Sequence, residues 1–362
     1  VAAVLGQTAI RSTSSNVGAN ARGLMYPYDE WKISVNNTTG QQADGNRNGW
    51  GSWNSIAYSL LSYFGRVSYN YDERYMAEAT MRADASSNFG PSNKWGYFPS
   101  VSLGWNMKNE EFLKDVPWLS ALKLRGSWGI NGNDNIGSFR YAVYMSTGNN
   151  YTFGSGANGS ETISIGAKPN GLANPNAKWE QSIQTDLGVD VGFLGNRVTF
   201  TADWYDKRTS GMLMSMQVPG YAGDSAPIGN VGTMSNSGVE LDLSYRDNYG
   251  DFSWNISANA TYTKNVLTEL GDDATSLYGS SHKIGQLTRG IVGLPFPYFY
   301  GHKSDGIFQN AEEVAAHVNK DGNLLQPNAQ PGDVRFRDVD GDGDIDDDDR
   351  TYIGKGTPDW SF

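Results

Sequence analysis

The feature that most constrains the fold is a set of segments in which apolar and polar residues alternate strictly. Residues 197–206 show the pattern clearly. The apolar positions are Val198, Phe200, Ala202 and Trp204, and the polar positions are Arg197, Thr199, Thr201 and Asp203. Because successive side chains of a strand point to opposite faces, this segment predicts a ribbon with one apolar and one polar side. Such a ribbon suits a soluble sandwich, with core and solvent faces, or a membrane barrel, with lipid and lumen faces.

The lengths of the connections favour the membrane barrel. We predict nine long strands and the start of a tenth, each near or above the ~9–11 residues that cross a bilayer at a tilt. Connections are short at Asp72, Gly195 and Tyr249 and moderate at Asn109–Leu119, whereas long polar segments occupy residues 12–51, 131–178, 207–234 and 264–357. Short turns on one rim and long loops on the other are typical of outer-membrane barrels. A sandwich instead has turn signals every ~8–12 residues.

The predicted fold class is therefore all-β, a transmembrane antiparallel β-barrel with long extracellular loops. Nine strands and part of a tenth do not close such a barrel. An open edge in lipid leaves unpaired backbone groups that each cost several kcal/mol, so open sheets do not span membranes. We therefore expect residues 1–362 to form a partial barrel whose remaining strands lie outside this chain.

Composition excludes several other classes of protein. No run approaches the ~18 consecutive apolar residues of a transmembrane helix, although alternation lets a barrel be hydrophilic on average. The chain has no cysteine, so disulfides and cysteine-based zinc or redox sites are impossible. Its net charge of -11 argues against nucleic acid as a partner. Most of that charge lies in one short acidic segment near the C-terminal end.

Six tryptophans are placed where membrane interfaces would need them. They lie near strand ends or on apolar faces, as interfacial aromatic belts require. They are Trp105, Trp118, Trp128, Trp179, Trp204 and Trp254. Packing in an ordinary core is the other interpretation.

The acidic segment matches the calcium loop of EF-hands. Acids stand at positions 1, 3 and 5, glycine at 6, an aliphatic residue at 8 and a carboxylate at 12. Gly343 permits the sharp turn, and Asp349 replaces the usual glutamate, which makes bidentate closure less secure. The candidate ligands are Asp338, Asp340, Asp342, Asp344, Asp346 and Asp349, with Asp344 contributing its backbone carbonyl and Asp346 acting through water. We expect a structural calcium ion that braces the loop and binds with a dissociation constant of roughly 10⁻⁴ to 10⁻³ M. A solvated acidic loop without a metal is the alternative.

Just upstream, residues 310–318 predict a short helix, with Asn310 as its cap and Glu313 at the third helical position. Helix and acidic loop together predict a folded extracellular insert over residues 305–354. No catalytic constellation is visible. His282, His302 and His317 lack metal spacing and a nearby nucleophile, and the glycine-rich string at residues 154–159 lacks a βαβ context. The chain is not expected to be an enzyme.

Several stretches resemble the SusC-like, or RagA-like, TonB-dependent outer-membrane transporters. Their order and spacing cover about residues 52–362. The stretches are Trp95–Trp105, Phe112–Ser120, Leu122–Gly129, Asn174–Glu180, Asn230–Glu240, Asp305–Gln309, Gln326–Asp333 and Asp349–Gly354.

This resemblance implies a plugged barrel of about 22 strands in the outer membrane of a Gram-negative bacterium. It implies TonB-driven import of a large nutrient, an oligosaccharide or a peptide, with a SusD-like surface lipoprotein as a lid. No plug or TonB-contact segment is recognisable in this chain. The charged residues of the polar face would contact plug or solvent, and they are Glu78, Arg82, Asp186, Asp190, Asp203, Glu240 and Asp242.

A second hypothesis comes from a different class of protein. A calcium-braced, secreted β-rich adhesin or glycan-binding module would show the same alternation. In the importer hypothesis, Tyr26, Tyr28, Trp31 and Trp50 of a long loop would stack on sugar rings or pack structurally, and structural packing is the favoured role. The two hypotheses differ in whether the face holding Val198, Phe200 and Trp204 meets lipid or another protein layer.

Overall fold

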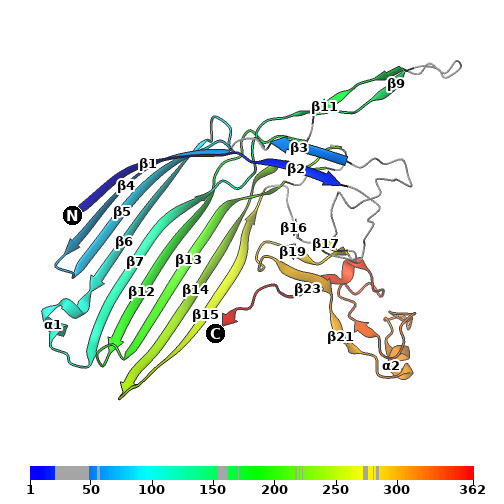
Figure 1. The fold of residues 1–362 in the computed structure, drawn as a ribbon. Coiled ribbons are helices and arrows are strands. Elements are labelled where there is room, and N and C mark those ends of the chain that lie inside the picture. Colours follow the sequence, from blue (N-terminus) through cyan, green and yellow to red (C-terminus); the bar gives the residue numbers. More distant parts are fainter. Residues whose placement is uncertain are drawn as a thin grey trace.

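The structure is a computed structural model that describes residues 1–20, 49–54, 58–153, 162–169, 171–216, 218–219, 221, 223–271, 276–279, 281–282 and 285–362. The described residues form one large antiparallel sheet and several small ones (Figure 1). The loop residues Tyr26, Tyr28 and Trp31 lie outside the described part of the chain.

Ten strands make up the large sheet within the described ranges, and each neighbours the next along the sequence. Nine of them are long and the tenth is short, as the sequence predicts. They are β1 (Ala2–Ser12), β4 (Tyr58–Tyr71), β5 (Tyr75–Ser86), β6 (Trp95–Asn106), β7 (Leu119–Asn133), β12 (Glu180–Phe193), β13 (Val198–Ser215), β14 (Ile228–Tyr249), β15 (Phe252–Leu270) and β24 (Trp360–Ser361).

Tight turns join these strands at one end of the sheet. Asp72 and Glu73 both have positive φ, at 53° and 52°, which is the backbone of the type I′ hairpin turns that match the twist of paired strands. The β6–β7 connection carries two short helical turns that the sequence did not predict, η3 (Met107–Asn109) and α1 (Glu111–Lys114). The Lys108 ammonium holds this connection folded by donating to the carbonyls of Leu113, Lys114 and Val116.

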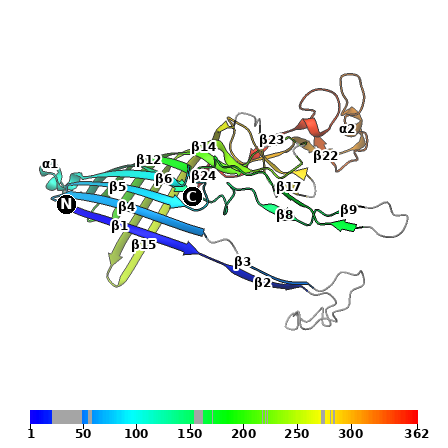
Figure 2. The same cartoon turned by 90° about the horizontal axis from the view of Figure 1, so that it is seen from above.

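Long loops and small sheets gather at the opposite end from α1 (Figures 1 and 2). Hairpins extend the sheet there, formed by β2 (Ser15–Asn20) with β3 (Gly49–Asn54), β8 (Met145–Thr147) with β11 (Ala167–Pro169), and β9 (Tyr151–Phe153) with β10 (Thr162–Ser164). A buried cluster closes this end of the sheet, and it contains Phe89, Phe98, Ile136, Ala177 and Trp179. The prediction of an interfacial position for Trp179 is therefore wrong: only 8% of this residue is exposed, and its indole donates to the Lys94 carbonyl.

The last loop, residues 271–359, joins β15 to β24 and contains its own secondary structure. Its four-stranded sheet has the order β16-β19-β20-β23. The strands are β16 (Leu277–Tyr278), β17 (Ser281–His282), β18 (Gly285–Gln286), β19 (Thr288–Gly290), β20 (Tyr298–His302), β21 (Ser304–Ile307), β22 (Val334–Phe336) and β23 (Arg350–Lys355), with the helix α2 (Ala311–Ala316) and the 3₁₀ turn η5 (Asp347–Asp349). The predicted helix is confirmed, because the Asn310 side chain accepts from the Glu313 amide.

Candidate functional site

The strand register separates the large sheet into two chemically different faces. Directly paired residues make one continuous apolar row across the sheet: Tyr69, Ala77, Leu103, Gly126, Leu187, Trp204, Val239, Tyr262 and Trp360. One residue along, the neighbouring row is mostly polar: Ser68, Glu78, Ser102, Ser127, Asp186, Tyr205 and Gly238. Many side chains of the apolar face are exposed; Leu103 is 61% exposed and Leu187 is 56% exposed. This face is therefore built to meet an apolar medium.

Aromatic side chains border the apolar face at both ends. At the turn end, rings stack in pairs across strands, Tyr75 with Trp105 at 6.3 Å and Trp118 with Phe193 at 6.0 Å between centroids. At the loop end, Tyr63 stacks on Trp95 at 6.2 Å. Trp95 and Trp105 bound strand β6, so the belts lie ~33 Å apart along the strand. At a ~45° tilt this corresponds to ~23 Å of depth, close to the ~25 Å apolar band of outer-membrane barrels.

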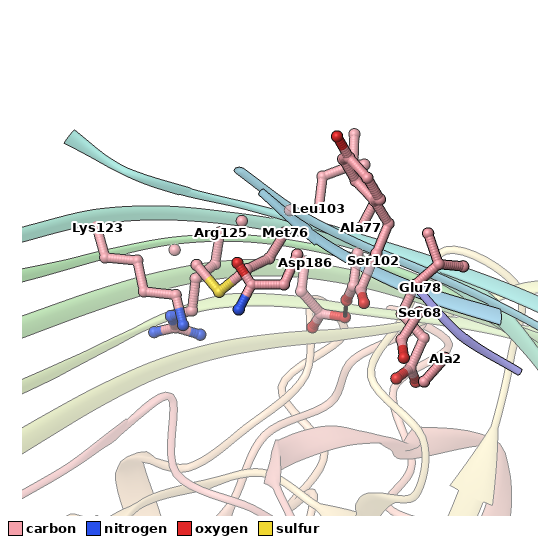
Figure 3. Close-up of a pocket in the computed structure, with 17 residues that line it drawn as sticks. Ala2, Ser68, Met76, Ala77, Glu78, Ser102, Leu103, Lys123, Arg125 and Asp186 are labelled. Atoms are coloured by element: carbon pink, nitrogen blue, oxygen red, sulfur yellow. Dashed lines mark hydrogen bonds between the residues drawn. The ribbon is translucent and has the colours of Figure 1, made fainter. Parts of the chain in front are cut away.

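The polar face carries a network of charged side chains (Figure 3). Lys123, Arg125, Asp186 and Glu78 extend toward the side of the sheet on which the last loop lies, whereas Leu103 lies on the other side. The Arg125 guanidinium donates to Asp190 at 2.8 Å and to Asp203 at 3.1 Å.

Gly188 leaves the room for this arrangement. A Cβ there would come within 2.1 Å of the Asp203 carboxylate and 2.9 Å of the Arg125 guanidinium carbon. Glycine at this position therefore lets one guanidinium lie across β12 and bridge two acids on different strands.

The other predicted lumen residues lie on the same face. Glu78 pairs with Arg66 at 3.4 Å, Arg82 with Asp84 at 2.8 Å, and Asp186 accepts from Ser127 at 3.0 Å. Register places Glu240 opposite Asp203 and Asp242 opposite Thr201. Arg66 and Arg125 supply the counter-charges, although neither was among the predicted lumen residues. The signal was available, since both occupy the polar phase of the alternation.

The last loop docks on the loop end of β14 and β15 through a buried core. Leu267 is fully buried, packs with Val231 and Leu277, and is joined by the loop residue Phe296. Backbone bonds support the contact, because the Leu267 amide donates to Leu294 at 2.9 Å and the Phe296 amide donates to the Asn265 side chain at 2.7 Å. The start of the loop is therefore fixed to the barrel strands.

Residues 305–354 pack around a second buried side chain. Phe308 is 1% exposed and meets the His317 ring edge-on at 5.5 Å. Its amide donates to the Asp333 carbonyl and its carbonyl accepts from the Gly332 amide, which ties the segment between β21 and α2 to the residues just before β22. The Arg337 guanidinium adds an ion pair to Asp305 at 2.5 Å.

The acidic segment folds so that three of the six predicted ligands converge. Carboxylate oxygens of Asp338, Asp340 and Asp342 lie within 4.8 Å of one another. Asp338 also accepts from the amides of Gly341 and Gly343 at 2.6 and 3.0 Å. Both glycines have positive φ, 80° and 94°, which confirms the predicted sharp turn. Three converging carboxylates at a glycine turn form the oxygen-rich donor set that calcium prefers.

The carboxylates of the other three predicted ligands bond to backbone amides of the same loop, and of these only Asp349 was predicted to bind the ion directly through its side chain. Asp344 and Asp346 accept from the nearby amides of Ile345 and Asp348. Asp349 is 1% exposed and uses both carboxylate oxygens to accept from Val339 at 2.6 Å and from Asp346 at 2.9 Å. Asp349 therefore closes the loop through backbone amides.

The carboxyl pKa values of Asp349 and Asp340 are shifted in opposite directions. Burial alone would raise the pKa of Asp349, but hydrogen bonds from backbone amides lower it below its ordinary value. For Asp340, a bond from the Asp342 amide lowers the pKa, yet burial and the neighbouring carboxylates together raise it above its ordinary value. The part of this rise that comes from the neighbouring carboxylates is a repulsion that a bound cation would relieve.

Within the described residues, no helix is long and apolar enough to cross a membrane. The alternating faces, the belts and the antiparallel order together define the class of protein, part of a transmembrane β-barrel. The chain belongs to the TonB-dependent receptor-like β-barrel family, whose model matches residues 5–352.

Comparison with known proteins supports this assignment. The chain is 36% identical over 305 residues to the TonB-dependent receptor SusC of Bacteroides thetaiotaomicron, which covers 82% of this chain and 28% of that protein. It is 34% identical over 309 residues to the TonB-dependent receptor P3 of Formosa agariphila, with 84% and 30% covered. The fold superimposes on the RagAB peptide importer in its open-open state with a TM-score of 0.75 at 24% identity, covering 99% of this chain and 35% of that one. The chain thus spans about a third of the length of these relatives.

Proposed function

We propose that the chain forms part of the barrel wall and extracellular loops of an outer-membrane importer for a large nutrient, an oligosaccharide or a peptide. Its location would be the outer membrane of a Gram-negative bacterium. The observation that carries the proposal is the division of one sheet into a lipid-type face between aromatic belts and a charged face. A lumen lined by charge keeps water and polar cargo in the barrel, while the apolar face holds the wall in lipid.

The named relatives support this function. SusC is named a TonB-dependent receptor, and RagAB is described as a peptide importer. By analogy, the inner-membrane TonB complex would drive transport. The ion pairs of Arg125 with Asp190 and Asp203 would keep the charged face ordered against a plug or solvent.

Uptake measurements test the energy source. The full-length protein, expressed in cells that depend on it for growth on one glycan or peptide, should lose uptake when TonB is deleted. Equal uptake with and without TonB would contradict active import. Comparing a series of oligosaccharides with a series of peptides would assign the nutrient class.

A SusD-like surface lipoprotein is the proposed partner on the extracellular side. The loops there already carry folded structure, including the docked last loop, and so present a defined surface to a lid. Affinity purification of the tagged full-length protein from membranes should recover the lipoprotein in near-equal amount. Recovery of the transporter alone under mild detergent would contradict the partnership.

We also propose that residues 305–354 act as a folded extracellular insert braced by calcium. Three carboxylates converge at a glycine turn, and Asp349 already holds the loop closed from the other side. Terbium luminescence and calorimetry on the full-length protein should detect one site that Asp340→Asn weakens and calcium competes for. Identical binding curves for the parent and the variant would leave this segment a solvated acidic loop.

The secreted adhesin is the less supported hypothesis. A secreted module would bury the face that holds Leu103, Leu187 and Trp204 under a second protein layer. In the described residues that face is open along its length, and the chain belongs to a family of membrane receptors. Both observations favour the barrel.

A further inference from the structure

A groove crosses the lipid-type face at its loop end, between β1 and β6. Its floor is one row of directly paired residues, Ala9, Leu61, Ala85 and Trp95. The two alanines leave a trough beside the larger side chains, and the groove encloses about 470 Å³. Trp95 ends this row at β6 and stays 42% exposed. An apolar trough on this face has the shape and chemistry for an acyl chain.

Basic side chains line the end of this groove that lies nearest the loops. Arg11 and Lys94 line it together with Ser59 and Ser87. Register places Arg11 beside Ser59, and Ser59 and Ser87 bond to each other through their backbones at 2.9 Å. Arg11 and Lys94 are both exposed and form no ion pair with any residue that the structure describes. None of the residues that line the groove is acidic.

The position of the two cations relates them to the membrane surface. Trp95 and Tyr63 belong to the aromatic belt at the loop end, and aromatic belts sit at the level of lipid headgroups. Arg11 lies near the loop end of β1, and Lys94 ends the short connection between β5 and β6, directly before Trp95 of this belt. Arg11 on β1 and Lys94 beside the first residue of β6 lie three strand spacings apart, about 14 Å, a span that two long basic side chains cover together with a phosphate between them. Lysine and arginine at such positions reach the headgroup phosphates.

We propose that this groove is a binding site for a phosphorylated glycolipid of the outer leaflet. An acyl chain would lie in the trough over Ala9, Leu61 and Ala85, against the Trp95 ring. A headgroup phosphate would sit between Arg11 and Lys94, where a guanidinium donates two parallel bonds to phosphate oxygens and an ammonium adds a point charge. The inference rests on the proposed placement in the outer membrane, and it adds a specific lipid site to the wall.

A matched lysine on the same face provides the control. Lys264 is exposed on β15 and faces outward at the loop end of the sheet. Its cross-strand neighbour Ser237 pairs in turn with Asp206, so an acid lies in its own row. Lys264 therefore has the charge and the rim position of Lys94 without the apolar trough.

Native mass spectrometry on the full-length protein in detergent tests the site. The probes are diphosphoryl lipid A and the same lipid after removal of both phosphates. The double variant Arg11→Ala/Lys94→Ala should bind diphosphoryl lipid A about tenfold or more weakly than the parent, and Lys264→Ala should stay within about twofold. The parent should bind the dephosphorylated lipid no better than the double variant binds the phosphorylated one. Heat-modifiable gel migration confirms that each variant is folded.

Three outcomes would overturn the proposal. The first is unchanged affinity in the double variant. The second is an equal loss in Lys264→Ala, which would mean unspecific attraction to a basic rim. The third is displacement of the lipid by millimolar inorganic phosphate, which would mean a free-anion site. TonB-dependent uptake by the double variant should equal that of the parent, so failure of the import proposal and failure of the lipid site are read from separate assays.

Discussion

The ten-stranded sheet and the last loop are both built from strands, yet they place their apolar side chains differently. On the sheet, apolar residues such as Leu103, Leu187 and Trp204 face outward and remain open. In the loop, Leu277, Tyr298 and Phe308 are almost completely buried. Charged side chains differ in the opposite way. The sheet pairs them with one another on its polar face, whereas the loop leaves most of its acidic side chains exposed to solvent.

This difference shows which environment each region needs. The loop carries its own core, so its fold depends on ordinary burial in water. The sheet has a hydrogen-bond ladder and ion pairs, but its apolar face has nothing to pack on within the described chain. Its stability therefore depends on lipid, and the predictions below separate the two sources of stability.

Removing the core of the loop should have the largest effect. Phe308→Ala deletes a buried ring and leaves a cavity, which costs about 3–5 kcal/mol. We expect hydrogen exchange to speed up across β21, α2 and β22 and to stay unchanged in β12 and β13. Faster exchange in the barrel strands as well would mean that the two regions are one cooperative unit.

A charge on the outward face should destabilise the sheet without affecting the loop. Leu187→Arg places a guanidinium in the apolar band, at a cost of about 2–4 kcal/mol near the bilayer midplane. Gln184→Arg adds the same charge to the inner face of the same strand and should cost little. Urea-dependent folding of the full-length protein into lipid vesicles measures both variants, and equal losses would contradict the assignment of the two faces.

Calcium should stabilise the loop alone. With a dissociation constant of 10⁻⁴ to 10⁻³ M, calcium at ~10 mM adds about 1.4–2.7 kcal/mol. Gly343→Ala should abolish the gain, because a Cβ there comes within 2.8 Å of the Asn319 amide at a φ of +94°. Gly322→Ala has a similar φ of +82° but open space, and it should cost stability while keeping the calcium response. A calcium response in Gly343→Ala would contradict the site.

The smallest effect should come from Asp305, which lies in β21 of the two-stranded β21–β22 sheet. The hydrogen bond from Arg337 lowers the pKa of the Asp305 carboxyl. The stabilisation that ionised Asp305 gives the folded state is therefore fully present above the unfolded-state pKa of ~3.9. It is lost as the pH falls through the lower folded-state pKa. Asp305→Asn should weaken amide protection of β21 and β22 slightly at pH 7, and the difference from the parent should vanish near pH 2. A difference that persists in acid would point to packing instead.

Much of the sheet could be predicted from the sequence, because strand alternation and turn residues are local signals. The nine long strands, the tight turn at Asp72 and the short tenth strand all follow from them. Trp179 was misplaced because its partners, Phe89 and Phe98, come from distant segments of the chain. The helix α1 is only four residues long, and its stability comes from Lys108 capping carbonyls, which no periodicity reveals.

The acidic loop was predictable in part. The glycine turn and the convergence of Asp338, Asp340 and Asp342 follow from the spacing of the motif. The role of Asp349 does not, because the motif assigns its carboxylate to the metal and the fold directs it to backbone amides. The groove at Arg11 and Lys94 was not visible in the sequence, since it joins residues that only the strand register brings together.

The central claim is that the two faces of the sheet meet different media, and β13 offers the most direct test. The chain has no cysteine of its own, so single cysteines introduced at residues 198–204 can carry a fluorescent label. Brominated lipids in reconstituted vesicles should quench labels at Val198, Phe200, Ala202 and Trp204 and spare those at Thr199, Thr201 and Asp203. Quenching with a period of two residues would confirm the wall of a membrane barrel. Uniform quenching, or none at all, would contradict it.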